Sequence, residues 1–267
     1  MSWECSRRAV LVGSAVAPVV VTLASCRTDA AGPWRTDPSA AASEPGARRG
    51  RLGFRQPSPP ASVSPRTGQF HIPGLTGTQA AAVYVPPRAD REPLRLVVML
   101  HGAGGVTQSA LKILRDAADR HRLLLLAPKS TAATWDVIAG GYGPDVRNLD
   151  RLLSEVATAY PVRGYTIAGF SDGASYALSL GLTNGDVFDS VIAFSPGFQA
   201  PESTTGAPRV FVSHGTADQV LPIDRCSRRI VAALEESDYR VTYHEFEGGH
   251  AVPEAVQSRA VEWLDEA

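Results

Sequence analysis

Two short runs of the chain, residues 96–100 and 123–126, consist only of apolar side chains. A strand with one face in water alternates apolar and polar residues, whereas a strand covered on both faces is apolar throughout. From about residue 68 onward, such runs alternate with helical patterns. This alternation is typical of a mostly parallel sheet flanked by helices, so we predict an α/β fold for residues 68–267.

The periodicity of the apolar residues locates the individual elements. Strands are predicted near residues 82–85, 94–100, 123–127, 165–168, 191–194, 209–213 and 240–246. Helices are predicted near residues 108–121, 146–159, 172–182, 223–236 and 253–264. In an open sheet of this kind, ligands bind in the loops that follow the strands. We therefore expect the functional residues in those loops.

A glycine-flanked serine follows the predicted strand at residues 165–168. Residues 169–173 read GFSDG and lead directly into a predicted helix, which is the context of the G-x-S-x-G nucleophile elbow. The glycines permit a sharp turn that exposes the serine hydroxyl beside the helix N-terminus. Free N–H groups at that terminus favour a developing oxyanion. Ser171 is therefore the candidate nucleophile.

A serine nucleophile needs a histidine base, and the base needs an acid that orients it. After an elbow of this kind, the acid and then the histidine follow along the chain. Asp218 comes just after the strand at residues 209–213 and is the candidate acid. His250 follows two glycines beyond the last predicted strand and is the candidate base. His244, inside that strand, stays open as an alternative.

Other polar residues of this region receive structural interpretations. Asp224 is expected at the start of the following helix, where a carboxylate stabilises the helix dipole. Asp186 and Asp189 precede a strand and belong to the wrong end of the sheet. His214 is expected to hold its own loop.

A second backbone donor is needed to complete an oxyanion hole, besides the N–H of Asp172 after the serine. The glycine-rich turn HGAGG, residues 101–105, ends the strand at residues 94–100. Glycines let the main chain approach a substrate carbonyl closely. The N–H of Ala103 is the first choice for this donor, and that of Gly104 is the alternative.

The segments HGAGG, GFSDG, HGTAD and GGH occur in this order, and through them residues 68–267 resemble the α/β-hydrolase superfamily. Within it, GFSDGASYAL and VIAFSPGF are similar to the phospholipase/carboxylesterase group and to secreted polyhydroxybutyrate-depolymerase-like and feruloyl-type esterases. The resemblance implies ester hydrolysis through an acyl-enzyme, with Ser171, Asp218 and His250 as the triad. It implies neither a metal nor an organic cofactor.

The connection at residues 195–208 is too short to form a lid, so we expect no cap domain and a serine that is open to solvent. This favours a short acyl group or an exposed ester. Trp135 and Tyr142, in the loop at residues 130–144, and Phe198 are the candidate substrate contacts. For Trp135 and Tyr142, packing within the loop is the alternative role.

Arg7 and Arg8 precede an uncharged, largely apolar run that ends at Cys26. The residues around the arginines resemble a twin-arginine export signal, and Leu23 to Cys26 resemble the lipobox of bacterial lipoproteins. We predict a signal peptide over residues 1–25 and a lipidated Cys26, in a protein of the bacterial cell envelope or a secreted one. Two alternatives stay open: residues 9–26 form an N-terminal anchor helix, or the signal is cleaved at another position and a soluble protein is released.

More than half of residues 27–67 are Ala, Gly, Pro or Ser. Such a segment buries too little apolar surface to offset its chain entropy. We therefore predict a disordered tether over residues 26–67 and a catalytic domain over residues 68–267.

A net charge of −1 argues against a nucleic-acid binder, which needs a clustered cationic surface. The leading hypothesis is a serine esterase of the cell envelope that acts on small-molecule or polymer-borne esters, held on the membrane by lipid if Cys26 is processed. One alternative is a catalytically silent lipoprotein that uses the fold for binding. Another is a peptidase of the same fold.

Overall fold

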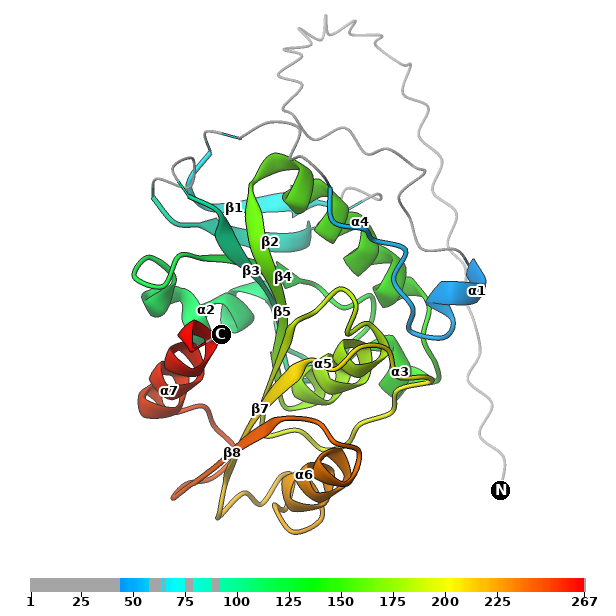
Figure 1. The fold of residues 1–267 in the computed structure, drawn as a ribbon, viewed down its shortest axis with the longest axis vertical. Coiled ribbons are helices and arrows are strands. Elements are labelled where there is room, and N and C mark those ends of the chain that lie inside the picture. The colour runs from blue at the N-terminus through cyan, green and yellow to red at the C-terminus, as the bar shows by residue number, and fades with distance from the viewer. Residues whose placement is uncertain (1–43, 58–63, 65, 75–78, 88–91, 267) are drawn as a thin grey trace, which may run out of the picture. The chain divides into compact units, whose positions relative to one another are not determined.

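The computed structural model describes residues 44–57, 64, 66–74, 79–87 and 92–266, which all belong to one compact unit, residues 33–267. An eight-stranded sheet runs through this unit in the order β1-β2-β4-β3-β5-β6-β7-β8 (Figure 1). The strands are β1 Gly68–Pro73, β2 Gln79–Val85, β3 Leu94–Leu100, β4 Leu123–Pro128, β5 Val162–Phe170, β6 Ser190–Phe194, β7 Arg209–Gly215 and β8 Val241–Phe246. β2 pairs antiparallel with both β1 and β4, and the remaining pairs are parallel.

Helices cover both faces of the sheet. The helices are α1 Glu44–Ala47, α2 Thr107–Ala118, α3 Asp136–Ala139, α4 Pro144–Ala159, α5 Asp172–Thr183, α6 Ser227–Glu236 and α7 Glu254–Asp265. α4, α5 and α6 share one core cluster with Leu96 and Val98, whereas α2 and α7 share the other with Val97 and Met99. Successive residues of β3 thus enter opposite cores, which explains why the strand is apolar throughout and confirms the predicted α/β class.

The strand order places the predicted functional loops side by side. β5 lies between β3 and β6, and β7 and β8 follow in parallel. Because parallel strands all end at the same edge, the loops after β3, β5, β7 and β8 meet there. The connection between β6 and β7, residues 195–208, contains no helix or extended strand, so it forms no cap over this edge.

Three elements were not predicted from the sequence, because each carries too few periodic apolar residues: α1, which lies in the predicted tether, β1 and α3. β1 buries only Phe70 and Ile72, on alternate positions of an edge strand. α3 is a single turn inside the loop predicted for residues 130–144. α6 also begins later than predicted, at Ser227, because residues 222–226 form turns instead.

The tether predicted for residues 26–67 is wrong over residues 44–57, which pack against the domain. Leu52 and Phe54 are each 2% exposed and belong to the core cluster of α4 and α5. The N–H of Phe54 donates to Asp150 Oδ1 in α4 at 2.6 Å, and that of Leu52 donates to Asn184 Oδ1 at 2.9 Å. Figure 1 shows this segment, in blue, beside α4. The prediction failed because it relied on the average composition of the segment. Leu52 and Phe54 are two residues apart, so both side chains lie on the same face of an extended chain.

The predicted signal peptide, the twin arginines and Cys26 lie outside the described residues. Within the described part of the chain, no helix has the length and apolar character needed to span a membrane.

Candidate active site

Ser171 occupies a strained turn between β5 and α5. Its φ of 57° lies in the left-handed region, which non-glycine residues rarely adopt. The flanking glycines are required sterically: a Cβ on Gly169 would lie 2.1 Å from the Gly173 carbonyl oxygen, and one on Gly173 would lie 2.3 Å from that of Leu100. The residues predicted as a nucleophile elbow therefore form one.

The three side chains predicted as a triad meet at the carboxyl edge of the sheet. His250 Nε2 lies 2.8 Å from Ser171 Oγ, and His250 Nδ1 lies 2.6 Å from Asp218 Oδ2. In this arrangement the serine hydroxyl donates to Nε2 and the Nδ1–H donates to the carboxylate, which fixes the tautomer that accepts the serine proton. Ser171 is 9% exposed, so a small part of its surface reaches solvent.

Close contact between two loops brings the acid to the histidine. The N–H of Ala217 donates to the Gly248 carbonyl at 2.9 Å. Gly215, at the end of β7, must be glycine, because a Cβ there would lie 2.4 Å from the carbonyl oxygens of Gly248 and Gly249. The absence of a side chain at Gly215 therefore lets the loop after β8 lie directly on the loop after β7.

Asp218 is held as a carboxylate. Burial alone would raise the pKa of Asp218, but the N–H of Leu221 and the ring of His250, which both donate to the carboxylate, outweigh it and lower that pKa. The N–H groups of Val220 and Leu221 each donate to Oδ1 at 2.9 Å. The acid is therefore ionised at neutral pH and faces the histidine with its other oxygen.

His214 does more than hold its own loop. Its ring is fully buried, and burial lowers its pKa, so it is neutral at neutral pH. Nε2 lies 2.7 Å from the Leu221 carbonyl oxygen, which requires the proton on Nε2, while Nδ1 accepts from the Ser227 hydroxyl at 2.5 Å. The same Nε2 lies 3.1 Å from Asp218 Oδ2. A second histidine thus supports the acid, a contact that the sequence does not reveal.

Backbone hydrogen bonds distinguish the two candidates for the oxyanion donor. The Gly104 N–H donates to the Ala133 carbonyl at 2.7 Å, so this alternative is not available to a substrate. The N–H groups of Ala103 and Asp172 donate to no acceptor in the described part of the chain. Gly102 lies against the serine, since a Cβ there would be 3.3 Å from Ser171 Cβ. Ala103 and Asp172 are therefore the candidate donors that have no other acceptor, and their role in binding an oxyanion stays a prediction.

Trp135 and Tyr142 do not line a substrate wall, so that prediction is wrong and the packing alternative holds. Trp135 is 2% exposed and stacks on Tyr176 of α5 with 5.1 Å between the ring centroids. Its indole N–H donates to the His101 carbonyl at 2.9 Å. Tyr142 is buried and donates to the Ala200 carbonyl at 2.6 Å. The Trp135 ring therefore supports the glycine-rich turn, whereas the Tyr142 ring packs beside Tyr176 and holds the connection after β6.

An apolar side chain contacts the triad directly. Phe170 lies against His250, with 4.7 Å between the ring centroids. Phe198 is half-buried in the connection after β6, and its role as a substrate contact stays a prediction. Among the described residues, the large apolar side chains that are most exposed are Val106 and Val220, at 52% and 66%. Both lie in loops of this edge, a placement that the sequence analysis missed.

The remaining candidates have structural roles. His244 lies within β8, opposite Ser213 of β7. Asp224 forms an ion pair with Arg228, and Asp186 and Asp189 pair with arginines away from the serine. Within the described residues, no group of three His, Cys, Asp or Glu side chains is placed to hold a metal ion.

A serine on an elbow, its histidine and acid in the following loops and this strand order together define a serine hydrolase site on an α/β-hydrolase fold. The family model described as Phospholipase/Carboxylesterase matches residues 145–266, the segment that carries all three side chains. No curated protein matches the chain.

Solved structures share the fold. Esterase PE8 is 23% identical, with a TM-score of 0.55, over 75% of this chain and 99% of its own. The S-formylglutathione hydrolase FrmB of Staphylococcus aureus is 18% identical, with a TM-score of 0.60, over 76% and 99%. The Bacillus cereus carboxylesterase is 21% identical, with a TM-score of 0.55, over 70% and 93%.

Proposed function

We propose that the protein is a serine hydrolase that cleaves carboxylic esters through an acyl-enzyme. The observation that carries this proposal is the position of the His250 ring, which joins Ser171 Oγ at 2.8 Å to Asp218 Oδ2 at 2.6 Å. A hydroxyl is a poor nucleophile at neutral pH unless a base takes its proton during attack. The match of residues 145–266 to the Phospholipase/Carboxylesterase family supports an ester as the substrate.

Acylation begins when Ser171 Oγ attacks the ester carbonyl carbon and His250 Nε2 takes the hydroxyl proton. The carbonyl π electrons move onto oxygen, which receives the N–H groups of Ala103 and Asp172. The start of α5 adds the positive end of its dipole. When the carbonyl re-forms, the bond to the leaving alkoxide breaks, and the alkoxide takes the proton from His250.

Deacylation repeats these steps with water. His250 removes a proton from the water, the hydroxide oxygen bonds to the acyl carbon, and the oxyanion again lies between the two N–H groups. The bond to Ser171 Oγ then breaks and the serine recovers its proton from His250. Asp218 stays ionised throughout and stabilises the imidazolium.

An active-site-directed fluorophosphonate tests this assignment. The wild-type chain is expected to gain one covalent adduct on Ser171, and the Ser171→Ala variant none. Ser203→Ala removes an exposed hydroxyl from the connection after β6 and is expected to label like the wild type. Labelling of the Ser171→Ala variant at the wild-type rate would refute the proposal. A panel of chromogenic esters and peptide anilides then distinguishes an esterase from a peptidase.

We also propose that Cys26 carries a lipid that anchors an exported protein to the cell envelope. The support is in the sequence: the twin arginines, the apolar run and the small residues before Cys26. Mass spectrometry of the mature N-terminus should find an acylated Cys26, and Cys26→Ser should shift the protein to the soluble fraction. An unmodified N-terminus downstream of Cys26 would contradict the proposal.

A further inference from the structure

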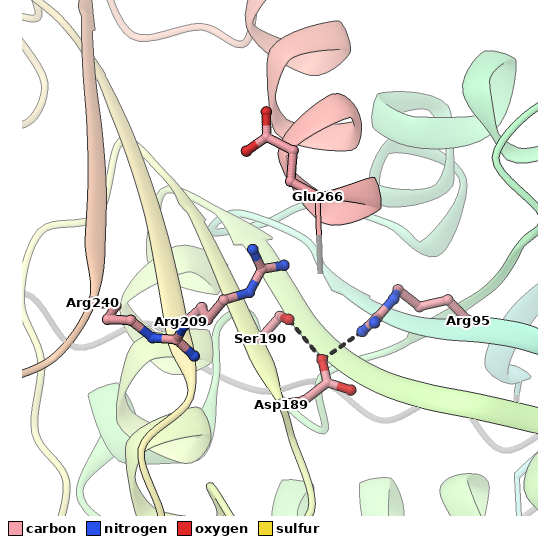
Figure 2. A pocket seen from close by; sticks show the side chains of 6 residues that line it. All are labelled: Arg95, Asp189, Ser190, Arg209, Arg240 and Glu266. Atoms are coloured by element: carbon pink, nitrogen blue, oxygen red, sulfur yellow. Dashed lines mark hydrogen bonds and ion pairs between the residues drawn. The ribbon is translucent and has the colours of Figure 1, made fainter.

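A hollow of about 400 Å³ lies at the edge of the sheet opposite the serine, where several parallel strands begin (Figure 2). The lining residues are Arg95, Asp189, Ser190, Arg209, Arg240 and Glu266. They come from the start of β3, β6 and β7, from the residue before β8 and from the end of α7. The mechanism uses none of them.

An ion pair between Arg95 and Asp189 lines this hollow. Arg95 is 6% exposed, and its Nη1 donates to Asp189 Oδ1 at 2.5 Å and to Thr166 Oγ1 at 3.2 Å. The Ser190 hydroxyl donates to the same carboxylate oxygen at 2.6 Å. Gly164 makes room for the pair, because a Cβ there would lie 2.6 Å from Asp189 Oδ2. The charge of Asp189 is therefore already matched by Arg95.

Two further guanidinium groups have no such partner. Within the described residues, neither Arg209 nor Arg240 forms an ion pair. Arg209 begins β7 and Arg240 immediately precedes β8, and the Val210 N–H donates to the Arg240 carbonyl at 2.9 Å. Arg209 is fixed in place, with its guanidinium carbon 4.3 Å from the centroid of the Trp263 ring. Glu266 also lines the hollow, and the charge of its carboxylate partly offsets that of Arg209 (Figure 2).

Burial and the excess of positive charge in the hollow lower the pKa of Arg209. Burial has the largest effect, and the charges of Arg95 and Arg240 lower the pKa further, by more than the charges of Asp189 and Glu266 raise it. A bound anion would relieve this repulsion. Guanidinium groups bind phosphate oxygens through paired N–H donors, and a phosphate monoester carries about 1.5 to 2 negative charges at neutral pH. The three arginines of the hollow outnumber the carboxylates of Asp189 and Glu266, so the hollow favours an anion and attracts a doubly charged monoester more strongly than a singly charged diester.

We propose that this hollow is a binding site for a phosphate monoester group, with Arg209 and Arg240 as its main ligands. The site is separate from the serine site, because it lies at the opposite ends of the same parallel strands. Occupancy should therefore leave ester hydrolysis unchanged.

Calorimetric titration of the full chain with ethyl phosphate tests the proposal, with dimethyl phosphate as the diester comparison. The wild type is expected to bind the monoester more tightly. Combining Arg209→Gln with Arg240→Gln should weaken that binding roughly tenfold or more, the loss typical of charged hydrogen bonds. The matched control combines Arg225→Gln with Arg229→Gln, exposed arginines around the start of α6, and should bind like the wild type.

Vesicles separate a lipid surface from a soluble monoester. Flotation with phosphatidylglycerol vesicles should be the same for the wild type and for the Arg209→Gln, Arg240→Gln variant. Binding of ethyl phosphate that is absent, or equal in these two proteins, would overturn the proposal. So would tighter binding of dimethyl phosphate, or vesicle binding that depends on the two arginines, because either result would assign the hollow to a lipid diester.

Discussion

His214 and His250 both contact one oxygen of Asp218, at 3.1 and 2.6 Å. The two contacts differ in kind, because His250 exchanges protons during the reaction whereas His214 is buried and neutral. His214 is therefore a positioning residue. It supports the carboxylate with one N–H and holds the Leu221 carbonyl with the same N–H.

Replacing His214 should lower the rate of the reaction. In His214→Phe the Asp218 carboxylate loses a donor, so its position beside His250 is less well fixed. The value of kcat/KM should fall, by up to about 100-fold if the acid shifts by an ångström.

His214→Gln keeps an N–H donor and should restore much of the kcat/KM that His214→Phe loses. Equal losses in the two variants would show that the donor to Asp218 is not what positions the acid.

Asp218 should also make stability depend on pH. Its pKa is lower in the folded chain than the value near 3.9 of an unfolded aspartate. A depressed pKa contributes stability that is present above the unfolded pKa and is lost as the pH falls through the folded pKa. Urea unfolding should therefore show Asp218→Asn less stable than the wild type at pH 7, with a difference that shrinks below about pH 4. A difference that is independent of pH would contradict this assignment.

At the scale of elements, the segment at residues 44–57 belongs to the folded domain. Phe54 is 2% exposed and lies edge-on to Tyr165 of β5, with 5.3 Å between the ring centroids. Phe54→Ala should lower the free energy of unfolding by about 3 to 5 kcal/mol, as for other buried aromatic residues. Arg55→Ala, at the exposed neighbouring position, should cost little. Equal urea midpoints for these two variants would show that the segment is not part of the core.

The loop at residues 130–144 acts on the site through the glycine-rich turn. Trp135→Phe keeps an aromatic ring against Tyr176 but removes the donor to the His101 carbonyl. Because that turn carries the Ala103 N–H, we expect kcat to fall while KM changes little. Steady-state kinetics with one chromogenic ester checks this. A rise in KM alone would instead indicate a direct contact of Trp135 with the substrate.

Across the whole molecule, the features predicted from sequence are those that short local patterns determine. The elbow needs only five residues between a strand and a helix. Chain order then restricts the histidine to two candidates, and the loop positions favour His250 and Asp218. Features that depend on packing between distant segments were missed. Leu52 and Phe54 fit between helices that lie far along the chain, and an aromatic residue such as Trp135 is equally suited to a substrate wall or to a core.

Kinetics of the Ser171→Ala variant with a good chromogenic ester test the central claim most directly. Ser171 and His250 act as one unit, so loss of the hydroxyl alone should lower kcat by on the order of 10⁴ or more, while circular dichroism and thermal unfolding stay close to those of the wild type. A folded Ser171→Ala protein that hydrolyses the ester at the wild-type rate would contradict the account.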